Sequence, residues 1–495
     1  MNIIVIMTDQ QRRETVSANP GAWIETPNID SIAKQGTNFQ RAYAACPVCV
    51  PTRATFMSGL HANRMYTEGF GSPMDNTGNV PDLSKTLPNI LKNAGYSTAV
   101  CGKTHLRPYG CNLGFEVSHL FENDPDVEYT KYLEENGFDY KDMMHDLGYS
   151  GVWEYKCKIP LEHYSSTWVK NKAIDYIRSQ NGKDQPFFMW TSFLKPHNPY
   201  NPPEPYYGSI DHNTMPAPVK SEKEWSEKGE VYKYRKQFYD QRIENGPPSE
   251  EDILKARARY CETVKLIDDG VGEIFSALEE TGQADDTAVI FVSDHGDLLG
   301  DHHLWHKTCA YEASAGVPML MKVPGKKGMG QSRALASTID LMPTCLDLAG
   351  LEVPPELQGK SLLRAYDNTP DDWRRNLYIE CGYYPSTMTA IVKEYKKYIH
   401  YMNGGEEELY DLKNDPDELE NLAYKKPHRK LRNKMRAELV ELVKKEGPYW
   451  CIDGDDLAKI KYTPRHNYYG AHKDKRLTPP GAKQGGVNTV SSYQQ

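Results

Sequence analysis

Short runs of apolar or β-branched residues recur along the first two thirds of the chain and predict buried strands. The runs cover residues 3–7 (Ile-Ile-Val-Ile-Met), 97–101, 187–193, 287–293 and 317–323. The first run is strongly β-branched and apolar, and it ends at the polar pair Thr8-Asp9. Runs of this length without polar alternation are typical of strands that are covered on both faces.

Helical spacing appears between these runs. From Ile253 to Leu278, apolar or small residues recur at intervals of three and four, and Gly282 lies just past the end of the pattern. This periodicity predicts a long amphipathic helix. A shorter helix-like stretch covers residues 86–94. Strands that alternate with helices predict an α/β fold with a large, mostly parallel central sheet and helices on both faces.

The pattern changes at about residue 375. Short strand-like runs at 377–380, 389–392 and 397–401 are separated by turn residues, and a charged amphipathic helix is predicted at 427–446. These features predict a smaller C-terminal α+β subdomain with an antiparallel sheet. We therefore expect three parts: an α/β domain at 1–370, the subdomain at 371–450 and an irregular arm at 451–495. Residues 200–250, rich in Pro, Glu, Lys and Tyr, are expected to form a long irregular excursion.

The composition of the chain argues against several classes of protein. Fifty-nine Lys and Arg against 68 Asp and Glu give a net charge of −9, so no basic excess indicates binding to nucleic acid. No stretch reaches the ~18–20 apolar residues of a membrane helix, and ten cysteines in 495 residues are too few for a disulfide scaffold. The run at 3–7 is too short for a signal peptide, so the sequence as written predicts a cytoplasmic protein, or an exported one if a leader was removed. The oligomeric state is left open.

Polar residues with catalytic or metal-binding potential follow the predicted strands. They are Thr8-Asp9-Gln10, Gly102-Lys103-Thr104-His105, Lys195-Pro196-His197 and Asp294-His295-Gly296-Asp297. Ligands of parallel α/β sheets bind at the carboxyl ends of the strands. The sequence therefore predicts that these segments meet in one site.

The segment from Cys49 to Arg53 has the form Cys-x-Pro-x-Arg and is followed by Ser58-Gly59. It resembles the signature of the type I, formylglycine-dependent sulfatases of the alkaline-phosphatase-like superfamily. The resemblance implies that Cys49 is oxidised to Cα-formylglycine by a formylglycine-generating maturation enzyme, and that Arg53 helps to hold that residue and the metal site. Cys46 does not fit the pattern, because position 48 is Val where the motif needs Pro. Thr52 replaces the usual Ser and keeps the hydroxyl.

Other elements of the same family appear in family order over residues 1–422. Asp9-Gln10 resembles the first metal-binding pair, which is more often Asp-Asp, and Asp294-His295 resembles the second. With Cys49 these residues imply one Ca²⁺ per chain, although His and Gln leave another divalent metal open. Further elements that match the family are Gly102-Lys103-x-His105, Lys195-Pro-His197, Lys307 after Leu304-Trp305-His306, and Leu409–Leu412 with Asn414-Asp415-Pro416.

The resemblance implies a sulfuric ester hydrolase that releases inorganic sulfate. Arg53, Lys103 and Lys307 would supply positive charge around the sulfuryl group, while hydrated formylglycine at 49 attacks sulfur. His197 and Lys307 would protonate the leaving alcohol, and His105 would act as the base that lets sulfate depart.

A sulfated carbohydrate is the expected substrate. The Lys-Pro-His-x-Pro element at 195–199 resembles that of sulfatases acting on glycosaminoglycan uronates, and tyrosines follow it at 200, 206 and 207. A phosphonate monoester or phosphodiester hydrolase and a choline-sulfate hydrolase on the same scaffold stay open, as does a catalytically inactive binding protein. Specificity is expected to reside in residues 61–80, 106–165 and 200–250.

Overall fold

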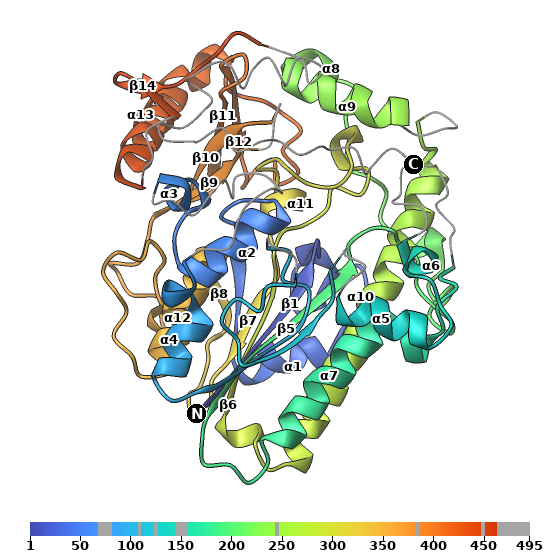
Figure 1. The fold of residues 1–495 in the computed structure, drawn as a ribbon. Coiled ribbons are helices and arrows are strands. Elements are labelled where there is room, and N and C mark those ends of the chain that lie inside the picture. The colour runs from blue at the N-terminus through green and yellow to red at the C-terminus, as the bar shows by residue number, and fades with distance from the viewer. Residues whose placement is uncertain are drawn as a thin grey trace, which may run out of the picture.

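The computed structural model describes residues 1–67, 82–106, 110–122, 127–144, 156–242, 247–382, 386–446 and 451–462 (Figure 1). Parts of the segments expected to carry specificity, and residues 463–495 of the expected arm, lie outside the described residues. Among the described helices, none is both long and apolar enough to cross a lipid bilayer.

A sheet of eight strands forms the centre of the molecule, in the order β4-β3-β5-β1-β6-β7-β2-β8. The strands are β1 (Asn2–Asp9), β2 (Thr37–Tyr43), β3 (Ser97–Gly102), β4 (Val117–Leu120), β5 (Phe187–Pro196), β6 (Thr287–Ser293), β7 (Met319–Lys322) and β8 (Gly330–Ser337). All pairings are parallel except those of β7, which runs antiparallel to β6 and to β2. The predicted large, mostly parallel sheet is confirmed.

The apolar run from Ile3 to Met7 in β1 is buried on both faces of this sheet. Ile3, Val5 and Met7 face one part of the core, and Ile4 and Ile6 face the other. Helices cover each face, with α4 and α12 on one side and α7 and α10 on the other (Figure 1). The described helices that surround the sheet are α1 (Pro27–Gln35), α2 (Cys49–Ser58), α3 (Ala62–Thr67), α4 (Leu87–Asn93), α5 (Glu128–Glu135), α6 (Tyr140–Met144), α7 (Ser165–Ser179), α10 (Glu250–Glu280), α11 (Glu312–Ala315) and α12 (Leu341–Leu348).

All five strands predicted for the central sheet are present, and the predicted long helix is α10, which Ser249 and Asp252 cap at its N-terminus. Three strands of the central sheet were not predicted, nor were the C-terminal strands β12 (Glu406–Asp411), β13 (Ile452–Asp453) and β14 (Asp456–Leu457). In β2 and β8 polar residues interrupt the apolar positions, and β4 has only four residues. The expectation of an irregular excursion at 200–250 was partly wrong. This segment contains α8 (Glu224–Glu227) and α9 (Glu230–Arg242), whose sequences lack a clear apolar stripe.

A second, smaller sheet follows near the C-terminus and confirms the predicted antiparallel subdomain. Its order is β12-β11-β10-β9, and its strands are β9 (Asn376–Cys381), β10 (Met388–Lys393), β11 (Lys396–Tyr401) and β12 (Glu406–Asp411). Helix α13 (Arg429–Glu446) packs against the sheet through Met435, Leu439 and Val443. The boundaries predicted for the three parts stay predictions.

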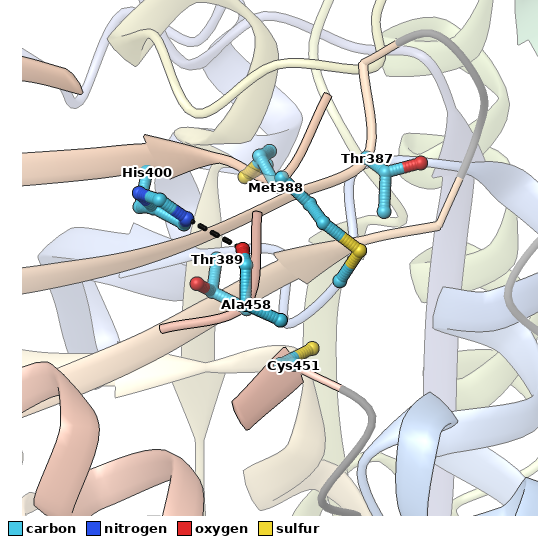
Figure 2. Close-up of a pocket in the computed structure, with 7 residues that line it drawn as sticks. Thr387, Met388, Thr389, His400, Cys451 and Ala458 are labelled. Atoms are coloured by element: carbon cyan, nitrogen blue, oxygen red, sulfur yellow. Dashed lines mark hydrogen bonds between the residues drawn. The ribbon is translucent and has the colours of Figure 1, made fainter. Parts of the chain in front are cut away.

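The segment after α13 returns to this second sheet. It contains the two-residue strands β13 (Ile452–Asp453) and β14 (Asp456–Leu457). His400 Nε2 lies 2.9 Å from the Ala458 carbonyl oxygen beside a small pocket that Met388 and Cys451 also line (Figure 2). None of the predicted site residues lines this pocket.

Candidate active site

The carboxyl ends of neighbouring central strands bring the predicted site residues together. Strands β1 and β6 pair in parallel, with Thr8 opposite Ser293, so Asp9 and Asp294 end the two strands side by side. On the other side of β1 lies β5, followed by His197, and beyond it β3, followed by Lys103. The placement of these residues at one edge of the sheet agrees with the rule for parallel α/β sheets.

Cys49 is the first residue of α2, and its side chain is buried at the centre of this group. Its Sγ lies 3.1 Å from His295 Nε2, 3.1 Å from Lys307 Nζ and 3.6 Å from Asp9 Oδ1. Burial and Asp9 raise the pKa of the Cys49 thiol, but Lys307 and other positive groups outweigh them, so that pKa is lowered overall. Residue 49 therefore stands where a nucleophile would meet both cationic and metal-binding groups.

Arg53 lies one turn along α2 from Cys49 and connects three strand ends. Its Nε donates to Asp294 Oδ2 over 2.9 Å, and its Nη2 donates to Asp9 Oδ2 over 3.2 Å. Its Nη1 donates to the Lys103 carbonyl over 2.6 Å. Since all these groups are buried, the guanidinium compensates the carboxylates and holds one oxygen of each in place.

The other oxygens, Asp9 Oδ1 and Asp294 Oδ1, lie 3.7 and 3.5 Å from His295 Nε2, and Asp294 Oδ1 also accepts hydrogen bonds from the amides of Gln10 and His295. Ligand atoms of Asp9, Cys49, Asp294 and His295 all lie within 4.8 Å of one another. His295 Nδ1 lies 2.9 Å from the Gly296 carbonyl, which favours a proton on Nδ1 and leaves the Nε2 lone pair free. Two carboxylates and a free imidazole nitrogen make a donor set that fits a divalent cation.

Gln10 was predicted as a further metal ligand, and the structure places it beside this group. Its Oε1 accepts a hydrogen bond of 2.7 Å from Lys307 Nζ, and its Nε2 donates to Asp297 Oδ2 over 2.5 Å. Asp297 also accepts a 2.6 Å hydrogen bond from the Tyr200 hydroxyl. A ligand role for Gln10 stays a prediction. Asp297 was not recognised as a separate site residue, although it stands three positions after Asp294.

Two lysines reach the site from different sides. Lys103 Nζ donates to Asp9 Oδ2 over 2.6 Å. Burial alone would lower the pKa of Lys307, but Cys49 and the carboxylates Asp9 and Asp294 raise it overall. Burial also opposes ionisation of Asp9, yet Lys103 and the other positive groups hold the pKa of Asp9 well below its usual range. The site thus places fixed positive charge on two sides of residue 49.

His105 and His197 are the two remaining predicted residues. Burial, together with Lys103 for His105 and Lys307 for His197, holds the pKa of each histidine well below its usual value. His197 Nδ1 lies 2.7 Å from the Asn198 carbonyl, which favours a proton on Nδ1. His105 has a left-handed backbone, with φ of 56°. Both rings are therefore neutral at neutral pH, and each keeps one unprotonated nitrogen that can accept a hydrogen bond.

Glu122, which no motif indicated, holds the turn that carries His105. The buried carboxylate accepts hydrogen bonds from the Thr104 backbone amide over 2.7 Å and from the Thr104 hydroxyl over 2.6 Å. It also accepts one from the His105 amide over 2.5 Å. Its position at the end of a short strand, 17 residues after His105, gave no sequence signal.

Comparisons with known proteins show the family of this chain. The Sulfatase family model matches residues 1–351, and a second model, described as N-sulphoglucosamine sulphohydrolase, C-terminal, matches residues 300–445. An arylsulfatase from Clostridium perfringens is 30% identical over 489 residues, covering 92% of this chain and 97% of its own.

Solved structures share the architecture. A phosphonate monoester hydrolase from Silicibacter pomeroyi aligns with a TM-score of 0.78 at 21% identity, covering 90% of this chain and 96% of its own. BT4656, solved in complex with its substrate D-glucosamine-2-N,6-O-disulfate, aligns with a TM-score of 0.71 at 26% identity, covering 90% of this chain and 98% of its own.

Proposed function

Because this chain belongs to the sulfatase family and is a sulfuric ester hydrolase, we propose that it removes sulfate from a sulfated sugar by means of a formylglycine at position 49. One observation carries the proposal. Residue 49 is buried at the strand ends, with His295 Nε2 and Lys307 Nζ each 3.1 Å from its side chain. A maturation enzyme that oxidises Cys49 is part of this proposal.

A divalent cation, Ca²⁺ in our proposal, would be held by Asp9, Asp294, His295 and residue 49, with Gln10 as a further candidate. When bound, it would supply positive charge to the sulfuryl oxygens and make a coordinated hydroxyl more nucleophilic. Arg53 holds Oδ2 of both aspartates, which would leave Oδ1 of each to bind the cation. With the cation bound, the five positive charges of the cation, Arg53, Lys103 and Lys307 would exceed the three negative charges of Asp9, Asp294 and Asp297, and this excess suits an anionic sulfate ester.

When residue 49 is a hydrated formylglycine, it would supply one hydroxyl to attack sulfur and a second hydroxyl that allows sulfate to leave. The side chains around it would neutralise charge and transfer protons. Lys103 and Lys307 neutralise the sulfate anion as negative charge shifts in the transition state. Lys307 would give its proton to the ester oxygen that leaves as an alcohol, whereas His197, whose ring is neutral, could only accept a hydrogen bond there. His105 would accept the proton during release of sulfate.

Two features support a sugar over a simple aryl ester. The Lys-Pro-His-x-Pro element at 195–199 is present, and BT4656 was solved with a sulfated glucosamine as its substrate. The tyrosines after this element give less support than the sequence suggested. Tyr206 donates to Asp269 over 2.7 Å, and Tyr207 lies against the Arg259 guanidinium, so both attach the excursion to α10.

A phosphonate monoester or phosphodiester hydrolase is the second candidate, and Gln10 is the observation that favours it. In place of a second carboxylate, the neutral amide of Gln10 meets Lys307, and the carboxylate of Asp297 lies behind it. Sulfate monoesters and phosphodiesters carry similar charge, so the geometry of the described site accommodates either centre.

A rate panel separates these substrates. Purified enzyme would be assayed with sulfated glucosamines, an aryl sulfate, choline sulfate, a phosphonate monoester and a phosphodiester. We expect the highest kcat/KM with a sulfated sugar. A kcat/KM for the phosphonate or the phosphodiester about tenfold above that of every sulfated sugar, or ~1.4 kcal/mol of transition-state preference, would overturn the proposal.

A further inference from the structure

The loop that carries Lys307 has an unusual backbone. Between Leu298 and Cys309, five residues other than glycine have positive φ: Leu299 (45°), His302 (55°), His303 (57°), His306 (61°) and Thr308 (80°). Each such residue costs on the order of 1 kcal/mol or more and persists only where its surroundings hold it. The conformation that directs Lys307 toward residue 49 therefore depends on contacts from outside the loop.

Those contacts come from residues 219–240, which we call the strap and which include α8 and most of α9. Arg235 of α9 donates from Nη2 to the backbone carbonyl of Lys307 over 2.6 Å. Its side chain is buried. A buried guanidinium bound to the carbonyl of a residue restricts the orientation of that peptide, and so the direction in which the side chain leaves the backbone.

The strap also binds His302, which lies five residues before Lys307 in the same loop. Its amide donates to the Val219 carbonyl over 2.7 Å, and its carbonyl accepts from the Tyr232 hydroxyl over 3.1 Å. Its Nδ1 lies 2.6 Å from Glu224 Oε1, and Glu224 in turn forms a buried ion pair of 2.7 Å with Lys228. Both ends of the strained loop are thus bound to one segment.

Lys228 attaches the strap to the rest of the molecule. Its ammonium is fully buried, 4.1 Å from the ring centre of Tyr311 and 5.6 Å from that of Tyr410 on β12. A desolvated cation between aromatic rings and a carboxylate is a strong attachment point. Lys228, near the middle of the strap, thus packs against a ring of the second sheet, while residues on either side of it hold the loop of Lys307.

We propose that Arg235 is a positioning residue of the catalytic reaction, through which the strap fixes Lys307 against residue 49. The inference rests on the role proposed above for Lys307 at the leaving oxygen. An alkoxide that leaves from a sugar develops more unstabilised charge than a phenolate does. Misplacing Lys307 should therefore slow sugar sulfates more than activated aryl sulfates, whereas a general loss of structure slows both equally.

The kinetic test compares Arg235→Met and Arg235→Lys with the wild type on a sulfated sugar and on 4-nitrophenyl sulfate. We expect Arg235→Met to lower kcat on the sugar about tenfold more than on the aryl ester, and Arg235→Lys to restore most of the loss. Lys233→Met, on the same helix and paired with the exposed Glu230, serves as the control and should match the wild type. In a Lys307→Met background, Arg235→Met should change kcat less than about twofold, because the two residues act as one unit.

Hydrogen exchange gives a readout that needs no turnover. In Arg235→Met, amides of residues 298–309 should exchange faster while the thermal midpoint stays within a few degrees of the wild type, about the shift that 1 kcal/mol produces. Equal slowing of both esters, additive effects in the double variant or unchanged exchange in the loop would each overturn the inference. If the wild type hydrolyses no sulfate ester, the proposed function fails, and the exchange result still decides whether Arg235 holds this loop.

Discussion

Around residue 49, several charges are buried that could not be buried singly. Asp9 and Asp294 have no exposed surface, and Arg53 lies between them. Removing one partner of a buried pair leaves an uncompensated charge, which costs about 3–5 kcal/mol. Each charged residue of the site therefore contributes to the placement of the others as well as to the chemistry.

Cys49 should be found as formylglycine in active enzyme, because it begins the Cys-x-Pro-x-Arg segment and sits among the cationic groups. Conversion of the CH₂SH side chain to an aldehyde lowers the mass of its peptide by about 18 Da, and the hydrate of this aldehyde carries the nucleophilic hydroxyl. Peptide mass spectrometry measures this shift directly. A Cys49→Ala variant provides an unmodified and inactive control, and an active wild type that carries only the thiol would contradict the prediction.

Asp294→Asn should release the metal and abolish turnover. Its carboxylate combines an oxygen within the metal-binding group with one that binds Arg53 Nε over 2.9 Å. Loss of an outer partner of a metal site costs ~10–100-fold in affinity, so loss of a ligand should cost at least ~100-fold. Metal content is measured by mass spectrometry of the purified protein. Asp286→Asn, at the exposed opposite end of β6, is the control, and an Asp294→Asn protein that retains one metal per chain would refute the assignment.

At the scale of elements, Glu380 of β9 joins the second sheet to the start of α3. Its carboxyl accepts hydrogen bonds from the Asn63 amide over 3.1 Å and the Tyr378 hydroxyl over 3.2 Å. Burial raises the pKa of Glu380 from 4.5 to about 8, so the folded protein keeps a proton that the unfolded chain loses. This contribution to stability is complete below pH 4.5 and is lost as the pH rises through about 8.

Glu380→Gln should therefore flatten the pH dependence of stability. In the wild type, Glu380 lowers the unfolding free energy by up to ~1.4 kcal/mol per pH unit as the pH rises through this window. Urea unfolding at pH 5.5, 7 and 8.5 measures the slope, and only the difference between variant and wild type is assigned to Glu380. The exposed Glu441→Gln on α13 is the control. Equal slopes for Glu380→Gln and the wild type would show that Glu380 is ionised in the folded protein.

How far the sequence predicts an element depends on how that element is stabilised. Strands β1 and β6 could be predicted because a continuous apolar run is stable in a strand only when both of its faces are buried, as in the middle of a covered sheet. Strand β8 lies at the edge of the sheet, and its polar sequence gave no such signal. The direction of β7 could not be predicted, because the apolar pattern of a strand does not depend on its orientation.

The residues of the candidate site also differ in how far the sequence predicts them. Asp9 and Asp294 could be placed together because the rule for parallel strands fixes which ends meet. Asp297 and Glu122 could not, because their roles follow from hydrogen bonds to Gln10 and to the turn at His105, which depend on loop geometry. Family resemblance indicated Lys307, but the contact from Arg235 that holds its backbone has no sequence motif.

At the scale of the whole molecule, the two sheets are joined by buried charges. Lys397 of β11 has Nζ 2.7 Å from Glu312 Oε1 and 2.7 Å from Glu418 Oε1, and its side chain has no exposed surface. Glu312, at the start of α11, also pairs with Arg13 over 2.6 Å. These ion pairs connect Arg13, which follows β1, through Glu312 to Lys397 in the second sheet. Loss of any one of them should therefore weaken the attachment of the two sheets to each other.

Lys397→Met should therefore destabilise the protein far more than the neighbouring Lys396→Met. The first variant leaves the buried Glu418 and the partly buried Glu312 without their shared cation, which should lower the unfolding free energy by about 3–5 kcal/mol. Lys396 pairs with Asp411 at a partly exposed position, where loss of the pair costs about 0–1 kcal/mol. Adding Glu418→Gln to Lys397→Met should recover part of the loss, because it removes one stranded carboxylate. Urea unfolding measures all three proteins, and equal losses for the two lysine variants would mean that the charges between the sheets add nothing to their attachment.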